Sequence, residues 1–245
     1  KLIDKYLIPT VTEQKRNSEI STPPTLIRKM LEMIPKDFWK NPDENLKIFE
    51  PCCGKGAFVL AIVGMLMDAF KEKIPDRQKR LKFVLENCIY FSDINPTNIY
   101  IVKLLLDPNK IYKLNYHLGN TLDLDIKEKW DLKYFTGVFG NPPYGSDKDK
   151  NNKVTNKGKG HKLWTKFVNK SLDEWLGENS YLLFVHPPGW RQINNKLGQK
   201  MLKYHIKKLN MNNVEEGRRT FGCSTSYDYY LLQKIEAVSG MKTII

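Results

Sequence analysis

Short apolar runs alternate along this chain with longer segments in which apolar residues recur every three or four positions. The short runs predict strands at 46–51, 88–93, 116–120, 136–140 and 181–188. Helices are expected at 57–73, 97–106, 162–175 and 194–208, and a last pair of strands near Val214 and at 227–233. This alternation favours an α/β fold with a doubly wound, mostly parallel sheet and an antiparallel C-terminal strand.

One further helix is expected before the first strand, in the segment "TPPTLIRKMLEMI". Leu26, Met30, Leu31 and Ile34 fall on one helical face. The two prolines precede or open the helix, where a missing amide hydrogen costs little. Polar residues then fill a linker at 35–45. We therefore expect an N-terminal segment over 1–45 and a globular domain over 46–245, which together form one unit.

The composition allows a large core. Of 245 residues 41% are hydrophobic, which suits one α/β domain of this size. No run of about 18 apolar residues predicts a membrane span, and the start "KLIDKYLIPT" lacks the apolar region of a secretory leader. The four cysteines form neither a C-x-x-C pair nor a zinc-like cluster. We expect no metal, no disulfides, and an intracellular, reducing location, either cytoplasmic or on the nucleoid.

The charge balance favours a polyanionic partner. The formal net charge is +13, which is typical of proteins that bind nucleic acid. Only seven of the 40 basic residues are arginine, and lysine, asparagine and isoleucine are abundant. An AT-rich genome gives the same bias without any functional cause. Charge alone therefore leaves both explanations open.

The first predicted strand runs into a glycine-containing loop, "FEPCCGKGAF". Gly54 and Gly56 allow the backbone to approach a ligand, and the following helix offers amide hydrogens at its N-terminus. In a doubly wound sheet such a turn lies at the carboxyl edge, where ligands bind. Glu50 stands four residues before Gly54, and a third spaced glycine is missing. The loop thus suits a cationic ligand better than a pyrophosphate.

Polar residues also end the second and third predicted strands. Asp93, in "YFSDIN", stands where an acid commonly accepts both ribose hydroxyls of a nucleoside cofactor. It could instead cap the next helix. Asn120, in "LGNTLD", could pair with an adenine edge or be an ordinary turn residue.

The fourth predicted strand ends in an unusual turn, "FGNPPYG". Pro142 and Pro143 remove two backbone donors and fix two φ angles in succession, so the strand cannot continue. The chain must leave the sheet rigidly, with Asn141 and Tyr144 held in set directions. Such stiffness is useful where a polar group and an aromatic face must hold position against a ligand.

Taken in order, these motifs resemble those of the S-adenosylmethionine-dependent DNA N6-adenine methyltransferases. The series runs "STPPTLIRKM", "FEPCCGKGAF", "FSDIN", "LGNTLD", "GNPPYG", "YLLFVHPPGWR" and "FGCSTSYDYYLLQ", and it spans about residues 18 to 233. The order resembles the gamma arrangement of many type II restriction–modification enzymes. The resemblance implies a Rossmann-like class I methyltransferase fold, S-adenosylmethionine as cofactor and double-stranded DNA as partner.

The family's cofactor contacts can be carried over to matching positions. Thr22 would contact the methionine carboxylate, so the helix after it would cap the cofactor. The backbone from Cys52 to Gly56 would cradle the amino-acid part of the cofactor. Asp93 would bind the ribose hydroxyls, and Ile94 would pack on the adenine. Asn120 stands where the family usually has an aspartate that reads the adenine amine, a departure that weakens this assignment.

The resemblance gives the diproline turn a catalytic role. The exocyclic nitrogen of adenine is a poor nucleophile because its lone pair is delocalised into the ring. Two acceptors, the Asn141 side-chain oxygen and the Pro142 carbonyl, would draw this amine toward tetrahedral geometry. Tyr144 would stack on the adenine and Phe221 would cover its other face, or else serve as a core aromatic. This arrangement requires an adenine extruded from the duplex.

A lysine-rich segment follows the turn, at 146–162. It could close over the target strand and bind phosphates, or be a solvated loop. Trp190 and Arg191 could touch the acceptor or merely end a strand, and His161 and His186 have no assigned role. The lysines expected to meet phosphates are Lys148, Lys150, Lys153, Lys157 and Lys159.

Two alternatives stay open. The first keeps methyl transfer but replaces the acceptor with an RNA base or a protein glutamine, which also present a planar nitrogen. The second is a catalytically silent subunit that binds nucleic acid or cofactor, although an intact Asn141, Pro142 and Tyr144 argue against it. The family usually reads its DNA site with a separate domain, and none is evident in this sequence. A recognition subunit or domain elsewhere is therefore expected.

Overall fold

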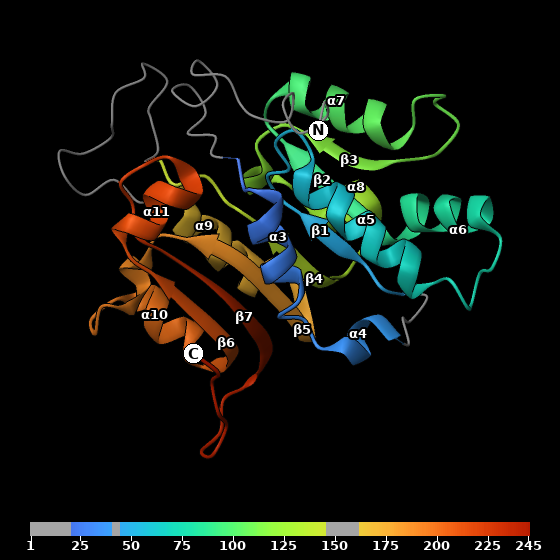
Figure 1. The fold of residues 1–245 in the computed structure, drawn as a ribbon. Helices are drawn as coiled ribbons and strands as arrows, with labels where there is room; N and C mark the ends of the chain where they lie inside the picture. Colours follow the sequence, from blue (N-terminus) through green and yellow to red (C-terminus); the bar gives the residue numbers. More distant parts are fainter. Residues whose placement is uncertain (1–20, 41–44, 146–161) are drawn as a thin grey trace.

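A seven-stranded sheet forms the centre of the computed structural model, which describes residues 21–40, 45–145 and 162–245 (Figure 1). The strand order is β3-β2-β1-β4-β5-β7-β6. The five strands from β3 to β5 are mutually parallel, and β7 is antiparallel to both β5 and β6. This confirms the predicted doubly wound, mostly parallel sheet with an antiparallel C-terminal strand. The strands are β1 (Ile48–Glu50), β2 (Ile89–Asp93), β3 (Asn115–Leu118), β4 (Phe135–Gly140), β5 (Leu176–His186), β6 (Tyr204–Asn212) and β7 (Tyr227–Glu236).

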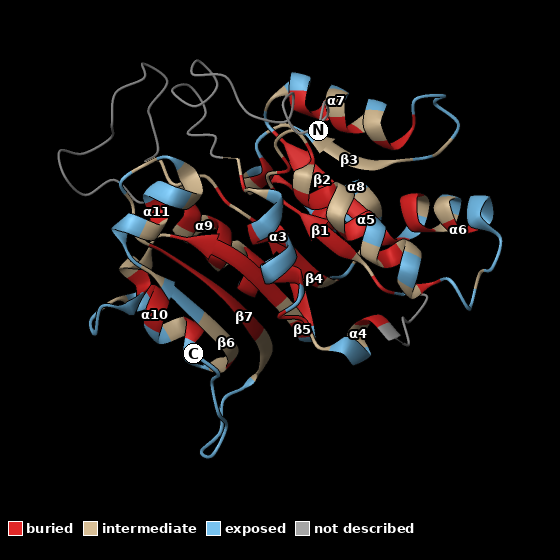
Figure 2. Cartoon of the chain, in the orientation of Figure 1, coloured by how far each residue is buried: buried red, intermediate tan, exposed pale blue. Residues whose placement is uncertain are grey.

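Helices cover both faces of the sheet and bury two apolar clusters. One cluster holds buried residues of the helices α3 (Pro24–Leu31), α4 (Lys36–Lys40), α5 (Ala57–Ala69) and α7 (Pro96–Leu106). The opposite cluster is built with α8 (Ile126–Trp130), α9 (Leu163–Lys170) and α10 (Lys196–Met201). Buried residues are accordingly concentrated along the central strands (Figure 2). The N-terminal helix α3 thus shares a core with the rest of the chain.

The C-terminal part departs from the prediction in its boundaries. The helix expected over 194–208 ends at Met201, and β6 already begins at Tyr204. Val214, expected in a strand, instead opens α11 (Val214–Phe221), which starts at a capping box between Asn213 and Glu216. Leu197 and Met201 lie one helical turn apart, but pairing with β7 holds residues 204–212 extended. Tertiary pairing therefore overrides the local pattern.

Several short elements were also missed by the sequence pattern. The polar linker at 35–45 contains α4, and α6 (Arg77–Phe83) leads into a π-helical turn (Val84–Cys88) ahead of β2. Smaller helical turns lie at Thr121–Asp123 and Pro188–Arg191, whereas the π-helical turn Ser171–Trp175 completes the helix predicted at 162–175. Each of the missed elements is too short to show the three- to four-residue recurrence of apolar residues that predicts a helix.

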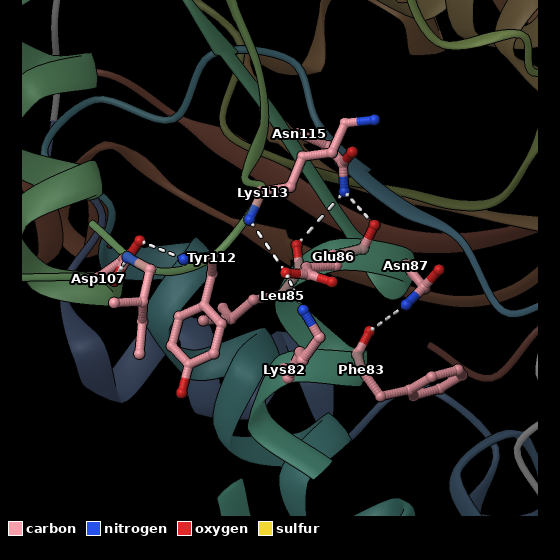
Figure 3. A network of polar contacts seen from close by, with 10 residues as sticks. Lys82, Phe83, Leu85, Glu86, Asn87, Asp107, Tyr112, Lys113 and Asn115 are labelled. Carbon is pink, nitrogen blue, oxygen red and sulfur yellow. Dashed lines mark hydrogen bonds and ion pairs between the residues drawn. The ribbon is translucent and has the colours of Figure 1, made fainter. Parts of the chain in front are cut away.

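Edge strand β3 is anchored to the π-helical turn by one amide side chain. The Asn115 Nδ2 group donates to the carbonyl oxygens of Glu86 at 2.9 Å, Leu85 at 3.3 Å and Ile89 at 3.4 Å. The Glu86 carboxylate in turn accepts from the backbone of Lys113 and from the Lys82 ammonium (Figure 3). These contacts fix the start of β3, and with it the loop that follows at the carboxyl edge.

Replacing this amide should destabilise the protein. In Asn115→Ala the carbonyl groups at the end of the π-helical turn lose their shared donor, which should lower the free energy of unfolding by about 1 to 2 kcal/mol. Urea denaturation at neutral pH measures the change. Asn87→Ala is the matched control, since its exposed side chain makes one bond, to the Phe83 carbonyl. Equal losses in the two variants would contradict the anchoring role.

Candidate active site

The loops that follow β1, β2, β4 and β5 meet at the carboxyl edge of the sheet. A chain of contacts joins them. The Gly54 amide donates to Asp93 at 2.8 Å, and the Cys52 thiol donates to the Asn141 carbonyl at 3.4 Å. The Tyr144 hydroxyl reaches the Val185 carbonyl at 3.5 Å. Residues up to 133 positions apart in sequence, from Cys52 to Val185, therefore form one site.

The glycine-containing loop after β1 adopts the tight turn that its sequence predicted. Gly54 and Gly56 have φ angles of 50° and 90°, which favour glycine. A Cβ on Gly56 would lie 2.8 Å from a methyl group of Val102, so the loop is pressed against α7. Gly56 also stands at the N-cap of α5. Glycine at position 56 is therefore required both by its backbone angle and by the close approach of α7.

Asp93, at the end of β2, is almost fully buried beside this loop. Its Oδ2 accepts from the Gly54 amide, and its Oδ1 accepts from the Asn95 amide at 2.8 Å and from Asn98 Nδ2 at 3.2 Å. Burial raises the pKa of Asp93, while these hydrogen bonds oppose the rise. The helix cap of α7 is Asn95, not Asp93. Asp93 therefore braces the loop, and the next side chain, Ile94, is 62% exposed.

Glu50, at the end of β1, is buried next to Asp93. Burial raises the pKa of Glu50 well above its usual value, and the charge of Asp93 adds to the rise. A hydrogen bond from the Val59 amide acts in the opposite direction. Among the described residues, the Oε2 atom has no hydrogen-bond partner. A buried carboxylate oxygen of this kind is costly, and a ligand that donates a hydrogen bond or carries positive charge would offset the cost.

The diproline turn continues directly from β4. A Cβ on Gly140 would lie 3.4 Å from Glu50, so the turn begins in contact with the end of β1. The Asn141 Nδ2 group donates to the hydroxyl of the buried Thr22 at 3.0 Å. This bond sets the orientation of the Asn141 amide, whose oxygen faces away from Thr22. The segment just before α3 therefore contacts the turn itself.

Tyr144 is half-buried at the end of this turn. Burial raises its pKa well above the usual value, and the nearby Cys223 and Tyr227 act in the same direction. A hydrogen bond with Asn141 opposes the rise. The Phe221 ring packs edge-on against Tyr227, with centroids 4.9 Å apart. Phe221 and Tyr227 thus meet at the junction of α11 and β7.

Some predicted site residues are placed differently or lie outside the described ranges. Asn120 is exposed, caps the turn at 121–123 and donates to Asp123 at 2.8 Å, so its side chain is engaged locally. Lys148, Lys150 and Lys153 fall within 146–161, outside the described residues.

Two contacts of the site have no sequence signal of their own. The first is the hydrogen bond between Thr22 and Asn141, which are 119 positions apart. The second joins β7 to the loop after β5: the buried carboxylate of Asp228 accepts a hydrogen bond from Trp190 and forms an ion pair with Arg191. The described part of the chain holds no group of three or more potential metal ligands. None of its helices is long and apolar enough to cross a membrane.

Comparison with known proteins places these features in context. A family model described as N-6 DNA methylase matches residues 3–178, and no curated protein matches the chain in sequence. The type I restriction–modification methyltransferase subunit of Streptococcus thermophilus is similar over 89% of this chain and 45% of its own, with 17% identity and a TM-score of 0.60. The DNA-bound type ISP enzyme LlaBIII is similar over 95% and 20%, with 13% identity and a TM-score of 0.67.

A third structure, a Listeria monocytogenes protein classed with the class I S-adenosylmethionine-dependent methyltransferases, has 14% identity and a TM-score of 0.61. The match covers 98% of this chain and 68% of that one. The predicted class I fold is therefore confirmed. This chain spans about half the length of the type I modification proteins that it matches.

The burial of Glu50 makes a prediction about stability. A raised pKa means that the folded protein holds this proton more tightly than the unfolded chain does, so stability falls as the pH rises above about 4. Glu50→Gln removes the charge at nearly constant shape. We expect the variant to be more stable than the wild type at neutral pH, with the difference shrinking toward pH 4. Urea denaturation across this pH range measures it, and an offset independent of pH would contradict the assignment.

Proposed function

This chain belongs to the N-6 DNA methylase family, and on that premise we propose that it methylates the exocyclic N6 atom of adenine in DNA, with S-adenosylmethionine as methyl donor. The observation that carries the proposal is a pair of contacts made by the loop after β1. This loop bonds to the Asn141–Tyr144 turn through Cys52, and to the buried Asp93 at the end of β2 through Gly54. A methyl-transfer site needs this neighbourhood, because donor and acceptor must meet in line.

The pocket residues suit a nucleoside that carries positive charge. Glu50 offers a buried carboxylate oxygen without a partner among the described residues, and Gly54 of the neighbouring loop is partly exposed. Asp93 would bind the ribose hydroxyls and Ile94, exposed beside it, would pack on the cofactor's adenine. Cys52, Gly54 and Gly56 would line the amino-acid part through their backbone. S-adenosylmethionine supplies a methyl group already activated by its sulfonium, so the protein has to position and not activate the donor.

Activation of the acceptor falls to the diproline turn. The Asn141 side-chain oxygen and the Pro142 carbonyl would accept the two hydrogens of the adenine amine and localise its lone pair. The bond from Asn141 Nδ2 to Thr22 supports this role, because it engages the amide nitrogen and leaves the oxygen as the acceptor for the adenine amine. Thr22 would thus act as a positioning residue, besides any contact with the cofactor's carboxylate. Pro142 and Pro143 hold both acceptors on one target.

Aromatic side chains would hold the target base. Phe221 packs edge-on against Tyr227, and Tyr227 is near enough to Tyr144 to raise its pKa. Stacking an adenine between such rings requires it to leave the duplex, which costs a few kcal/mol. Asn120 contributes less than the resemblance implied, since its side chain caps a local turn. The lysines at 148, 150 and 153 would contact phosphates near the base.

The proposed organisation has residues 1–45 as an N-terminal cofactor-capping segment and 46–245 as the catalytic domain. Recognition of a DNA sequence would come from a separate domain or subunit. The longer type I and type ISP structures that resemble this chain support such a division of labour.

The acceptor is tested directly with tritiated S-adenosylmethionine. The protein is incubated in parallel with unmethylated genomic DNA, bulk RNA and a protein extract, and the labelled product is identified by digestion and chromatography. Label in N6-methyladenine of DNA is expected. Label in RNA or in protein glutamine would keep the site but replace the acceptor, and cofactor binding without any transfer would overturn the proposed activity.

A single substitution tests the role of the turn. Asn141→Ala removes one acceptor and should lower methyl transfer by about 10² to 10³-fold, as for loss of one oxyanion-hole donor elsewhere. Cofactor affinity, measured by calorimetry, should change little. Asn87→Ala, remote and exposed, is the control. Near-normal turnover in Asn141→Ala would exclude the proposed mechanism.

A further inference from the structure

The loop between β5 and α10 lies beside the proposed site but has no part in the mechanism so far. It starts at Pro187, two residues after the Val185 carbonyl that the Tyr144 hydroxyl contacts. In Figure 1 it leads from β5 to α10, and Trp190 within it belongs to the same apolar cluster as Leu197 and Met201 of α10. The sequence from 187 to 196, "PPGWRQINNK", holds no acidic residue.

A buried carboxylate fixes this loop. Asp228, near the start of β7, is fully buried, and its Oδ2 accepts from Trp190 Nε1 at 3.0 Å and from Arg191 Nε at 2.9 Å. Its Oδ1 has no partner among the described residues. The neighbours on the same face of β7, Tyr230 and Leu232, belong to the apolar cluster. An acid in such surroundings is costly unless it does something that an apolar residue cannot do.

The loop is held in shape on its other side as well. The side-chain Nδ2 of Asn195 donates to the Gly189 carbonyl at 3.0 Å, and the backbone N–H of the same residue donates to the Gln192 carbonyl at 2.9 Å. A Cβ on Gly198 would lie 2.0 Å from the Trp190 carbonyl oxygen, so α10 presses directly on the loop backbone. Trp190 itself is 4% exposed. The position of Arg191 is therefore set before any ligand arrives.

Arg191 presents most of its donors outward. Its side chain is 40% exposed, its Nε is used by Asp228, and its Nη1 contacts the thioether sulfur of Met211 at 3.1 Å. A thioether is a weak acceptor, so the remaining N–H groups of the guanidinium suit a stronger one. A second cation lies close by, since Lys162 Nζ is 3.9 Å from the place of a Cβ on Gly189.

From this geometry we infer that Arg191 binds a backbone phosphate of the nucleic acid next to the target base, with Asp228 as its positioning residue. The inference rests on the proposed function and extends it to one contact of the substrate. A guanidinium held at Nε keeps its two terminal nitrogens for a bidentate contact, the geometry that phosphate favours. The buried Asp228 carboxylate thus fixes the orientation of the Arg191 guanidinium, which without this ion pair would be a mobile surface side chain.

The salt dependence of DNA binding tests the contact. Fluorescence anisotropy with a labelled duplex, at KCl concentrations from about 50 to 200 mM, gives the slope of log K against log salt. Arg191→Gln should weaken binding and reduce this slope by about one, the value for one lost phosphate contact. Arg77→Gln is the matched control, because Arg77 is an exposed arginine on α6. Equal effects of the two substitutions would overturn the inference.

Asp228→Asn separates positioning from general electrostatics. The variant gains one positive charge, so charge alone predicts tighter DNA binding. If Asp228 positions Arg191, binding should weaken instead, with a reduced slope, and Arg191→Gln added to it should weaken binding no further. Circular dichroism and thermal melting check that the variants are folded. Tighter binding by folded Asp228→Asn would contradict the positioning role.

The outcomes for the two proposals are distinct. Binding is measured without turnover, so a wild-type protein that binds DNA but transfers no methyl group would refute the proposed function and leave the phosphate contact to be judged from the slopes. Methyl transfer to DNA with an unchanged slope in Arg191→Gln would refute the phosphate contact alone. A wild-type protein without measurable DNA binding at any salt concentration would refute both.

Discussion

Two buried carboxylates, Glu50 and Asp93, stand side by side at the ends of adjacent strands, and the site is organised around them. Burying like charges together is unfavourable, and the pKa of each group is raised. Hydrogen bonds from the surrounding residues offset this cost more fully for Asp93 than for Glu50. Asp93 collects three hydrogen bonds and thereby fixes the glycine loop, whereas Glu50 keeps one oxygen without a partner in the described structure. The protein thus maintains a negative site that a cationic ligand would relieve.

Much of the fold could be predicted from the chain alone, because strands such as 136–140 are short, apolar and bounded by turn residues. The glycine loop and the diproline turn could also be predicted, because glycine allows positive φ angles and proline fixes φ, whatever the rest of the fold. The C-terminal part was not. No proline or glycine separates Met201 from Tyr204 to mark the end of the helix, and pairing with β7 makes residues 204–212 a strand. Side-chain partners across long separations, such as Thr22 with Asn141 or Asp228 with Arg191, leave no periodic trace.

The similar structures share this sheet at low sequence identity, and most are much longer than this chain. What persists at such distance is the arrangement of loops at one edge of a parallel sheet, because strand order alone brings them together. The residues within those loops are free to differ in detail. In this chain Asn120 caps its own turn, and Asp228 anchors the loop after β5.

The position of β7 has a consequence for the order in which the molecule can be assembled. It comes last among the strands in sequence, yet it lies between β5 and β6. Until residues 227–236 have left the ribosome, the apolar strand β5 has an open edge that can pair with other chains. Tyr227 and Asp228 arrive with that strand, so their contacts with Phe221, Trp190 and Arg191 form only when the sheet closes. A nascent or truncated chain would therefore be prone to aggregate before it could act, and chaperone protection during synthesis would matter most for this final step.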